Sequence, residues 1–474
     1  MSREERNEPF SWRFTLPLYL GSTLNPINSS LIATALVPIA AAMHVPVGQV
    51  ASLVAAVYLT SAVAQPAAGK LAEVFGPRRV FLVGTLCILA AGIIGGLAHS
   101  LGMLIVSRVF IGLGSSTAYP SAMVIVRRRA AAAAMSEPPG GVLGGLAIAG
   151  MAVAALGLPL GGLLVGAAGW QTTFFINIPV AVITLLAALL WLPPDEPRTA
   201  GAGVLSQIDF GGIVLFGGTI TSLLVFLLSL PSIHWVPLVI SVVACAALVA
   251  WELTAHEPFI DLRLLARNRA LTRTYLRVAL TSLVMYGAMY GVSQWLEPGR
   301  HLSPEQTGLL IFPMAIVAPI VSFPVSRRNL VRGPLLLTGA ALVVGSIGVA
   351  LMNGQTSMIF IAVVMLVFGL GMGLFTVGNQ TALYSQAPAQ TIGSAAGLFR
   401  TFAYLGSIGS SAVTGIVFRS TVNVQGLHTM AWVLLAAGVI VLVMTIADRK
   451  LVTVRKAPVA ATRTRKSESQ NGHN

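Results

Sequence analysis

The sequence predicts an all-α integral membrane protein with about fourteen transmembrane helices. Hydrophobic residues make up 55% of the 474 positions, whereas charged residues make up only 9%. A soluble domain carries roughly a quarter charged residues, so most of this chain cannot present an ordinary water-facing surface. The apolar runs contain many of the 48 glycines, and glycine is more frequent in membrane helices than in soluble ones. We therefore expect lipid to surround most of the chain.

Apolar windows long enough to cross a bilayer, about twenty residues each, define the expected helices in order. They fall near 15–41, 50–69, 80–98, 102–126, 140–166, 172–192, 210–230, 236–253, 272–296, 305–326, 334–352, 357–384, 391–418 and 429–447. This order gives an even number of spans, so both ends of the chain are expected on the same side of the membrane.

The distribution of Lys and Arg predicts which side that is. If the N-terminus is cytoplasmic, inner segments contain the basic clusters at 3–13, 70–79, 127–129, 263–273 and 327–332, and outer loops contain only Arg300 and Arg419. We therefore expect both termini in the cytoplasm of a bacterial-type plasma (inner) membrane. The net charge of +14 does not indicate nucleic-acid binding, because the sequence offers no soluble domain on which such a footprint would cluster.

One loop carries a motif. Between the second and third windows the sequence reads Gly69-x-Leu71-Ala72-Glu73-x-x-Gly76-x-Arg78-Arg79. It resembles the loop between the second and third helices of the major facilitator superfamily, a large class of secondary transporters. The resemblance implies a latch between two helical bundles, in which Glu73 faces the positive N-terminus of a helix in the other bundle. We expect Gly69 to end the second helix, Gly76 to form a tight turn, and the two arginines to anchor the inner face. The alternative is a plain basic loop.

Four further stretches carry the same resemblance. They are 27–36, Arg108-x-x-x-Gly112-x-Gly114, 157–162 with 169–179, and 257–263. The family resemblance implies two six-helix bundles that rock about a site near the midplane. Fourteen windows with two extra central helices resemble the drug–proton antiporter branch. The expected domains are an N-terminal bundle at 1–192, two inserted helices at 193–270, a C-terminal bundle at 271–447 and a basic cytoplasmic tail at 448–474.

The fifth window has glycines at helix-packing spacing. Gly157, Gly161 and Gly162 are expected to allow close helix approach, and Pro159 to permit a bend. In antiporters of this family the similar motif is thought to seal the bundle interface. Here the proline comes one position later than in the usual Gly-Pro pair, which keeps the packing role and weakens the implication of antiport.

Arg108 is the sharpest chemical feature, because a charge in the hydrocarbon region costs at least a few kcal/mol. In the family pattern this arginine communicates with a proton-carrying carboxylate in the first helix, but this chain has Asn28 there, and Asn cannot titrate. Either protons couple elsewhere, with Glu297 as the candidate, or coupling is absent or different. Arg108 is expected to bond backbone carbonyls, to line a cavity, or to meet an anion with help from Arg277 and Arg400. For Arg277 itself, snorkelling to the inner boundary is the favoured expectation.

Polar side chains on the presumed cavity faces suit amphipathic molecules of varied shape, because they lie among Met and aromatic residues. The expected cavity residues are Asn25, Asn28, Gln65, Arg108, Tyr119, Asn379 and Tyr384. For any one of them except Asn28, whose position matches a functional one in the family pattern, hydrogen bonding between helices is the favoured alternative.

Together these features predict a monomeric secondary transporter in the lipid bilayer that exports amphipathic, multidrug-type molecules by proton antiport with alternating access. The alternatives are an exporter of an anionic metabolite or lipid-like solute, a facilitator without proton coupling, and a transport-dead sensor. No Walker motif, nucleophile elbow or metal-site spacing occurs in the sequence. We therefore expect no enzymatic activity, no cofactor, no metal and no nucleic-acid partner.

Overall fold

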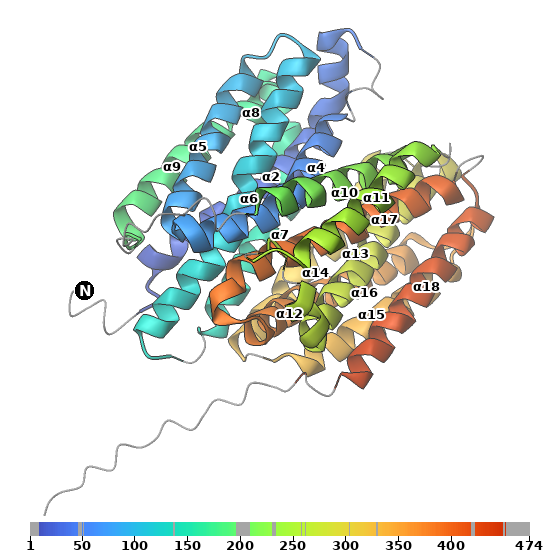
Figure 1. Cartoon of the computed structure of the whole chain (residues 1–474). Helices are drawn as coiled ribbons and strands as arrows, with labels where there is room; N and C mark the ends of the chain where they lie inside the picture. The colour runs from blue at the N-terminus through green and yellow to red at the C-terminus, as the bar shows by residue number, and fades with distance from the viewer. Residues whose placement is uncertain are drawn as a thin grey trace, which may run out of the picture.

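The computed structural model describes residues 9–45, 50, 52–135, 138–195, 209–229, 234–256, 258–260, 262–302, 304–328, 330–418, 422–448 and 451. Within these residues every regular element is a helix (Figure 1). The long elements are α2 (Trp12–Met43), α4 (Ser52–Phe75), α5 (Pro77–Gly96), α6 (Leu101–Ala132), α7 (Gly140–Ala168), α9 (Asn177–Trp191), α10 (Phe210–Ser229), α11 (Trp235–Glu252), α13 (Arg269–Gln294), α14 (Pro304–Arg327), α15 (Arg332–Ala350), α16 (Met358–Gln386), α17 (Ile392–Val417) and α18 (Val424–Ala447). The short ones are α8 (Thr172–Phe175), α12 (Leu262–Arg267), η2 (Trp295–Gly299) and η3 (Ala389–Thr391).

The multi-pass membrane character follows from helix length and hydropathy. In the described part of the chain, ten helical segments are long and apolar enough to cross a membrane, or eleven if the bent helix α2 is one span. The bend in α2 is 49° and lies between Ile32 and Thr34, where Pro38 removes the hydrogen bond to the carbonyl one turn earlier. The remaining long helices α7, α13 and α17 fall outside this set, so the number of fourteen spans stays a prediction.

Several helices begin or end at other residues than the apolar windows predict. Helix α6 continues to Ala132, so the basic run at 127–129 lies on the helix rather than in a loop. The sixth window is broken into α8 and α9 near Ile176. The predicted tail at 448–474 lies outside the described residues except for Asp448 and Leu451.

The helices pack as two groups. In the N-terminal group α2 packs on α7, and α6 packs on both α4 and α5, while α9 lies against α5. In the C-terminal group α14 packs on α16, α13 on α17, and α15 on α18. The inserted helices α10 and α11 pack on each other, and α10 also touches α4 and α17, so this pair lies across the junction of the two groups. The division of the chain into the four predicted domains stays a prediction.

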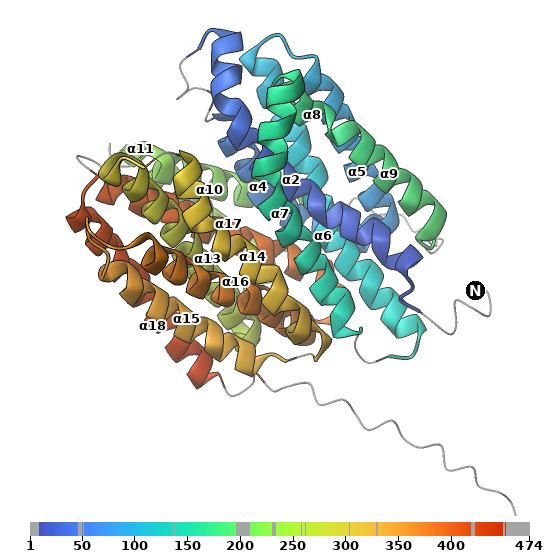
Figure 2. The same ribbon diagram turned by 180° about the vertical axis from the view of Figure 1, so that it is seen from behind.

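The two groups meet through α4 with α17 and α7 with α14. Figures 1 and 2 show the groups side by side near the start of α2, with their long axes diverging toward the opposite end. Following the predicted orientation, we call the end that holds the start of α2 the inner end and the opposite end the outer end.

The three largest buried apolar clusters of the described residues locate the core. One lies wholly within the N-terminal group and includes Leu24, Ile88 and Leu104. A second lies wholly within the C-terminal group and includes Met285 and Trp295. The largest draws residues from both groups and fills the space between them at the inner end.

Glycines set the distance between helices within the N-terminal group. A Cβ on Gly157 would collide with Ser30, and one on Gly161 with Thr34, so both glycines let α7 approach α2 closely, as predicted. Gly162 does not share this role, because no described atom lies within 4 Å of where its Cβ would be. The side chain of Pro159 lies outside what the structure describes.

Candidate substrate site and inner latch

Glu73 reaches from α4 to the first turn of α17. Its Oε1 accepts a hydrogen bond from the backbone N–H of Ser394 at 2.9 Å, and its Oε2 accepts one from the Ser394 hydroxyl at 3.1 Å. A carboxylate is stabilised at a helix N-terminus because the unpaired N–H groups carry partial positive charge. The contact between the bundles that the motif predicts is therefore present, and its role as a latch stays a prediction.

Glycines allow α4 and α17 to touch backbone to backbone beside Glu73. A Cβ on Gly69 would collide with the backbone of Gly393, and a Cβ on Gly397 would collide with the backbone of Gln65 and Pro66. The expectation that Gly69 ends its helix is wrong, because α4 continues to Phe75. Gly69 instead lets the backbones of α4 and α17 approach each other closely. An interpretation of the motif as a turn does not predict this role.

Asp195 is a residue of this inner site that the sequence analysis missed. Gly76 has φ +99°, a conformation that favours glycine, and it turns the chain from α4 into α5. The Asp195 carboxylate accepts hydrogen bonds from the backbone N–H groups of Arg78 at 3.1 Å and Arg79 at 2.9 Å, and it lies 3.9 Å from the guanidinium of Arg128. An acid just after the sixth window, on the inner side, was the available signal.

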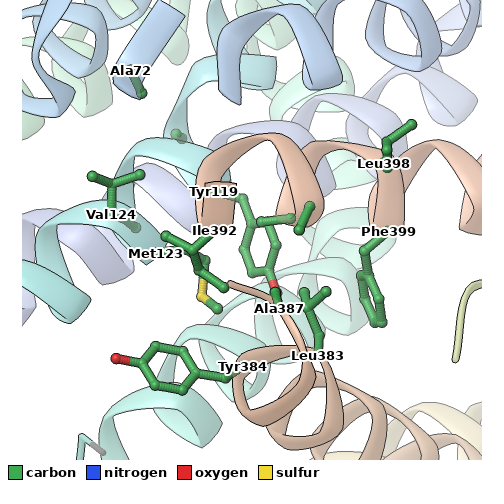
Figure 3. Close-up of a cluster of buried hydrophobic side chains, with 14 of the residues drawn as sticks. Ala72, Tyr119, Met123, Val124, Leu383, Tyr384, Ala387, Ile392, Leu398 and Phe399 are labelled. Carbon is green, nitrogen blue, oxygen red and sulfur yellow. The ribbon is translucent and has the colours of Figure 1, made fainter. Parts of the chain in front are cut away.

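A cluster of buried side chains includes Ala72 and Ile392, which lie close in the chain to Glu73 and Ser394 (Figure 3). We define the inner seal as Ala72, Tyr119, Met123, Val124, Leu383, Tyr384, Ala387, Ile392, Leu398 and Phe399, which come from both groups and belong to the largest buried cluster. Tyr119 and Tyr384, predicted as cavity residues, are only 5% and 4% exposed. Arg127 stacks over the Tyr384 ring at 4.9 Å and donates to its backbone carbonyl at 3.3 Å. Tyr384 is therefore part of the inner seal, and its role in a substrate cavity stays a prediction.

Asn28 pairs with Asn177, which the sequence analysis did not single out. The Asn28 Nδ2 donates to Asn177 Oδ1 at 2.6 Å, and the Asn177 Nδ2 donates back to Asn28 Oδ1 at 2.9 Å. Both side chains are 1% exposed. Each amide also donates to a backbone carbonyl, from Leu24 and Phe174 respectively. The position that the family pattern gives to a carboxylate is thus occupied by a satisfied, neutral amide pair between α2 and α9.

Arg108 lies beside this pair and is 2% exposed. It donates to the backbone carbonyl of Asn28 at 3.2 Å and stacks over the Phe174 ring at 5.0 Å, while its Nε has no hydrogen-bond partner. The predicted backbone-carbonyl contact is therefore present. Arg108 also borders a crevice too small to admit a water molecule, so its role in a substrate cavity stays a prediction. The crevice is lined by Asn28, Ser29, Ile32, Val54, Val57, Tyr58 and Arg108.

A second polar network joins the two groups just beyond the inner seal. The Tyr404 hydroxyl of α17 donates to Asn25 Oδ1 at 3.1 Å and accepts from Gln65 Nε2 at 3.1 Å. Asn25 in turn donates to the hydroxyls of Ser61 at 3.2 Å and Ser115 at 3.0 Å. The sequence analysis selected Asn25 and Gln65 and missed Tyr404, the residue that connects them.

The other predicted residues lie apart from these networks. Asn379 is fully buried, and its Nδ2 donates to the Phe375 carbonyl of its own helix at 3.2 Å. Glu297 lies half-buried in the π-helical turn η2 at the outer end of α13.

Arg277 does not snorkel, because it is 1% exposed and forms an ion pair with the fully buried Asp448 at 3.2 Å. Arg273 also contacts Asp448, at 3.4 Å. The described residues contain no group of three side chains suited to a metal ion.

Comparison with known proteins now identifies the class. The model of the Major Facilitator Superfamily matches residues 18–411, and the chain belongs to that family of membrane transporters. It is 34% identical to the uncharacterized MFS-type transporter YwoD of Bacillus subtilis, over 90% of this chain and 94% of that protein. It is 29% identical to the tetracenomycin C resistance and export protein of Streptomyces glaucescens, over 87% of this chain and 77% of that protein. The multidrug resistance protein Stp of Mycobacterium tuberculosis is 27% identical, over 78% of this chain and 68% of that protein.

Solved structures agree on the fold. The human organic anion transporter MFSD10 (TETRAN) aligns with a TM-score of 0.63 at 16% identity, over 90% of this chain and 99% of that one. The proton:xylose symporter XylE aligns with a TM-score of 0.61 at 15% identity, over 92% of this chain and 95% of that one. At such identities the likeness concerns the fold alone, and the chemistry has to be argued from this chain's own residues.

Proposed function

We propose that this protein is a secondary active exporter of amphipathic small organic molecules, working by alternating access. The observation that carries the proposal is the closed inner end, where Glu73 caps α17, glycine backbones touch and the inner seal joins the two groups. Polar and aromatic side chains of both groups lie just beyond this seal, where a site near the midplane is expected. Relatives named for resistance, export and multidrug resistance support the outward direction.

In this arrangement the inner end is shut and the axes of the two groups diverge toward the outer end, as expected for an outward-facing state. Export requires the opposite state as well, in which substrate enters from the cytoplasm. The change to that state has to separate Gly69 from Gly393 and withdraw Glu73 from α17. The contacts that hold the inner end closed therefore also set the balance between the two states.

We propose proton exchange as the driving reaction, with the proton carried outside α2. Asn28 and Asn177 are neutral and fully engaged with each other, so this pair offers no titratable group. Glu297 is our candidate, because it is a half-buried acid at the outer end of α13, where protons from outside can reach it. The glycine motif of α7 supports proton antiport only weakly, because Pro159 comes one position later than the proline of the usual Gly-Pro pair.

Everted membrane vesicles with an imposed proton gradient test both parts of this proposal. We expect the native protein to move a fluorescent amphipathic dye into acidified vesicles, and Glu297→Gln to reduce gradient-driven transport by about tenfold or more. Asn28→Asp should retain gradient-driven transport and alter its pH dependence. Vesicles from cells without the protein provide the background.

The outcomes separate the alternatives. Transport by the native protein that ignores the gradient would show a facilitator. Gradient response only in Asn28→Asp would show that the native chain has lost ordinary coupling. No movement of any dye by correctly inserted protein would overturn the export proposal itself.

A further inference from the structure

Arg400 is a cation inside the membrane domain without a matching carboxylate. It lies eight residues after the start of α17, about 12 Å along the helix axis, next to Phe399 of the inner seal. Its guanidinium stacks over the Tyr119 ring at 4.3 Å, and its Nε is buried without a hydrogen-bond partner. Among the described residues no Asp or Glu forms an ion pair with it. A charge at this depth costs at least a few kcal/mol, so an unpaired one indicates a function.

Arg400 is partly buried, and the two arginines that are almost fully buried, Arg108 and Arg277, show how such a charge is compensated in this chain. Arg277 forms an ion pair with Asp448 at 3.2 Å. Arg108 donates to the carbonyl of Asn28 and stacks on Phe174. For Arg400 the structure provides an aromatic face and no anion. Its guanidinium is thus the one of the three best suited to an anion that arrives with a ligand.

The surroundings of Arg400 are phenolic rather than acidic. Tyr404 lies one helical turn after Arg400 on the same face of α17, and Tyr286 lies on α13, which packs on α17. Tyr286 lies beside Tyr290, with ring centroids 5.9 Å apart, and Tyr404 lies beside Tyr58, with centroids 5.8 Å apart. These four tyrosines come from α4, α13 and α17 and are only partly buried. Their rings can stack on a planar body, and phenol hydroxyls can donate hydrogen bonds to an anion.

We propose that Arg400 binds the acid group of an aromatic organic anion, whose body lies among Tyr58, Tyr286, Tyr290 and Tyr404. A guanidinium fits a carboxylate because its planar fork of N–H groups forms two parallel hydrogen bonds. This assignment rests on the proposed export function and narrows its substrates to anionic amphipathic molecules. The inner seal forms the floor of the site, and the floor opens when the protein faces inward.

Fluorescein and rhodamine 123 form a suited pair of probes, because they share a planar ring system and carry opposite charge. We would measure their binding to the purified full-length protein in lipid nanodiscs by fluorescence anisotropy, at a pH where fluorescein is anionic. Arg400→Gln should weaken fluorescein binding about 10- to 100-fold, the usual weight of charge-assisted hydrogen bonds. Arg400→Lys should lose less, because it keeps the charge and loses the fork. Rhodamine 123 binding should stay unchanged or tighten.

Arg300→Gln is the matched control, because Arg300 also stacks on an aromatic ring, that of Trp295 at 5.5 Å, near the outer end. It should leave fluorescein binding unchanged. An equal loss of both dyes in Arg400→Gln would assign Arg400 to the stability of the inner seal and overturn the proposal. Binding of rhodamine 123 but not fluorescein by the native protein would overturn it too, and would leave the export function standing. Whether the protein exports at all is measured separately, by dye transport into the everted vesicles.

Discussion

The inner and outer halves of the junction between the two helical groups are built differently. At the inner end a single apolar cluster contains residues of both groups. Farther out each group has an apolar cluster of its own. The described hydrogen bonds between the groups also lie on the inner side or near the midplane, from Glu73 with Ser394 to Asn25 with Tyr404. Under the proposed alternating access, the inner contacts are the ones that must break for the protein to face inward.

The inner half relies on close contact of backbones, so small changes there should have large effects. Its glycines admit no side chain, and its apolar residues exclude water from the path between the groups. Near the midplane, tyrosine, amide and arginine side chains replace glycine. Such side chains tolerate small displacements, because each can lose one partner and gain water. We therefore expect the effects of substitutions to decrease from the inner end toward the midplane.

The largest effect is expected for Gly397→Val. Its side chain would collide with the backbone of Gln65 and Pro66, and overpacking of this kind costs about 1–3 kcal/mol or more. The inner end should then open, and substrate export should fall at least about tenfold. Cysteine accessibility at inner positions measures the opening, after Cys87 and Cys245 have been replaced.

Gly162→Val is its matched control, because no described atom lies within 4 Å of the new Cβ. Export should stay near the native level. If both valine variants opened the inner end equally, the contrast between the two halves would be wrong, and general sensitivity of the helices to valine would explain the result.

A smaller effect is expected for Glu73→Gln. The amide keeps one oxygen acceptor for Ser394 but loses the charge at the N-terminus of α17, which contributes about 0.3–1 kcal/mol. The fraction of molecules labelled at inner positions should rise about two- to fivefold. The shift should shrink in the Ser394→Pro background, where the N–H donor is missing. An unchanged labelling pattern in Glu73→Gln would exclude the latch.

The smallest effect on inner accessibility is expected for Tyr404→Phe. The variant keeps the ring beside Tyr58 and removes the hydroxyl that bridges Asn25 and Gln65. Asn25 is partly exposed and can gain water, whereas the buried Gln65 is left with an unpaired Nε2, so the free energy of unfolding should fall by about 1–3 kcal/mol. Thermal unfolding in detergent should shift by a few degrees at most, while inner accessibility stays native. A change in accessibility as large as that of Glu73→Gln would extend the latch to the midplane.

The fold could be predicted in outline and the site only in part. Apolar windows located the long helices, because each residue in a lipid-facing helix contributes to the same hydropathy signal. The inner motif located Glu73 and Gly76, because their roles depend on neighbours close in sequence. Asn177 and Tyr404 were not predicted as site residues, because each pairs with a residue more than a hundred positions away and no local sequence pattern marks it. Tyr384 was predicted as a cavity residue and lies in the inner seal, a position the sequence could not show because a tyrosine in an apolar helix suits either place.

The sequence by itself determined that the chain is a helical membrane transporter of this family, because hydropathy and short motifs are local properties. The tertiary structure decided how single polar residues are used. It paired Asn28 with Asn177, paired Arg277 with Asp448 and left Arg400 without an acid. The physical reason is that burying a polar or charged group is tolerated only when a partner satisfies it, and such partners come from helices distant in the chain.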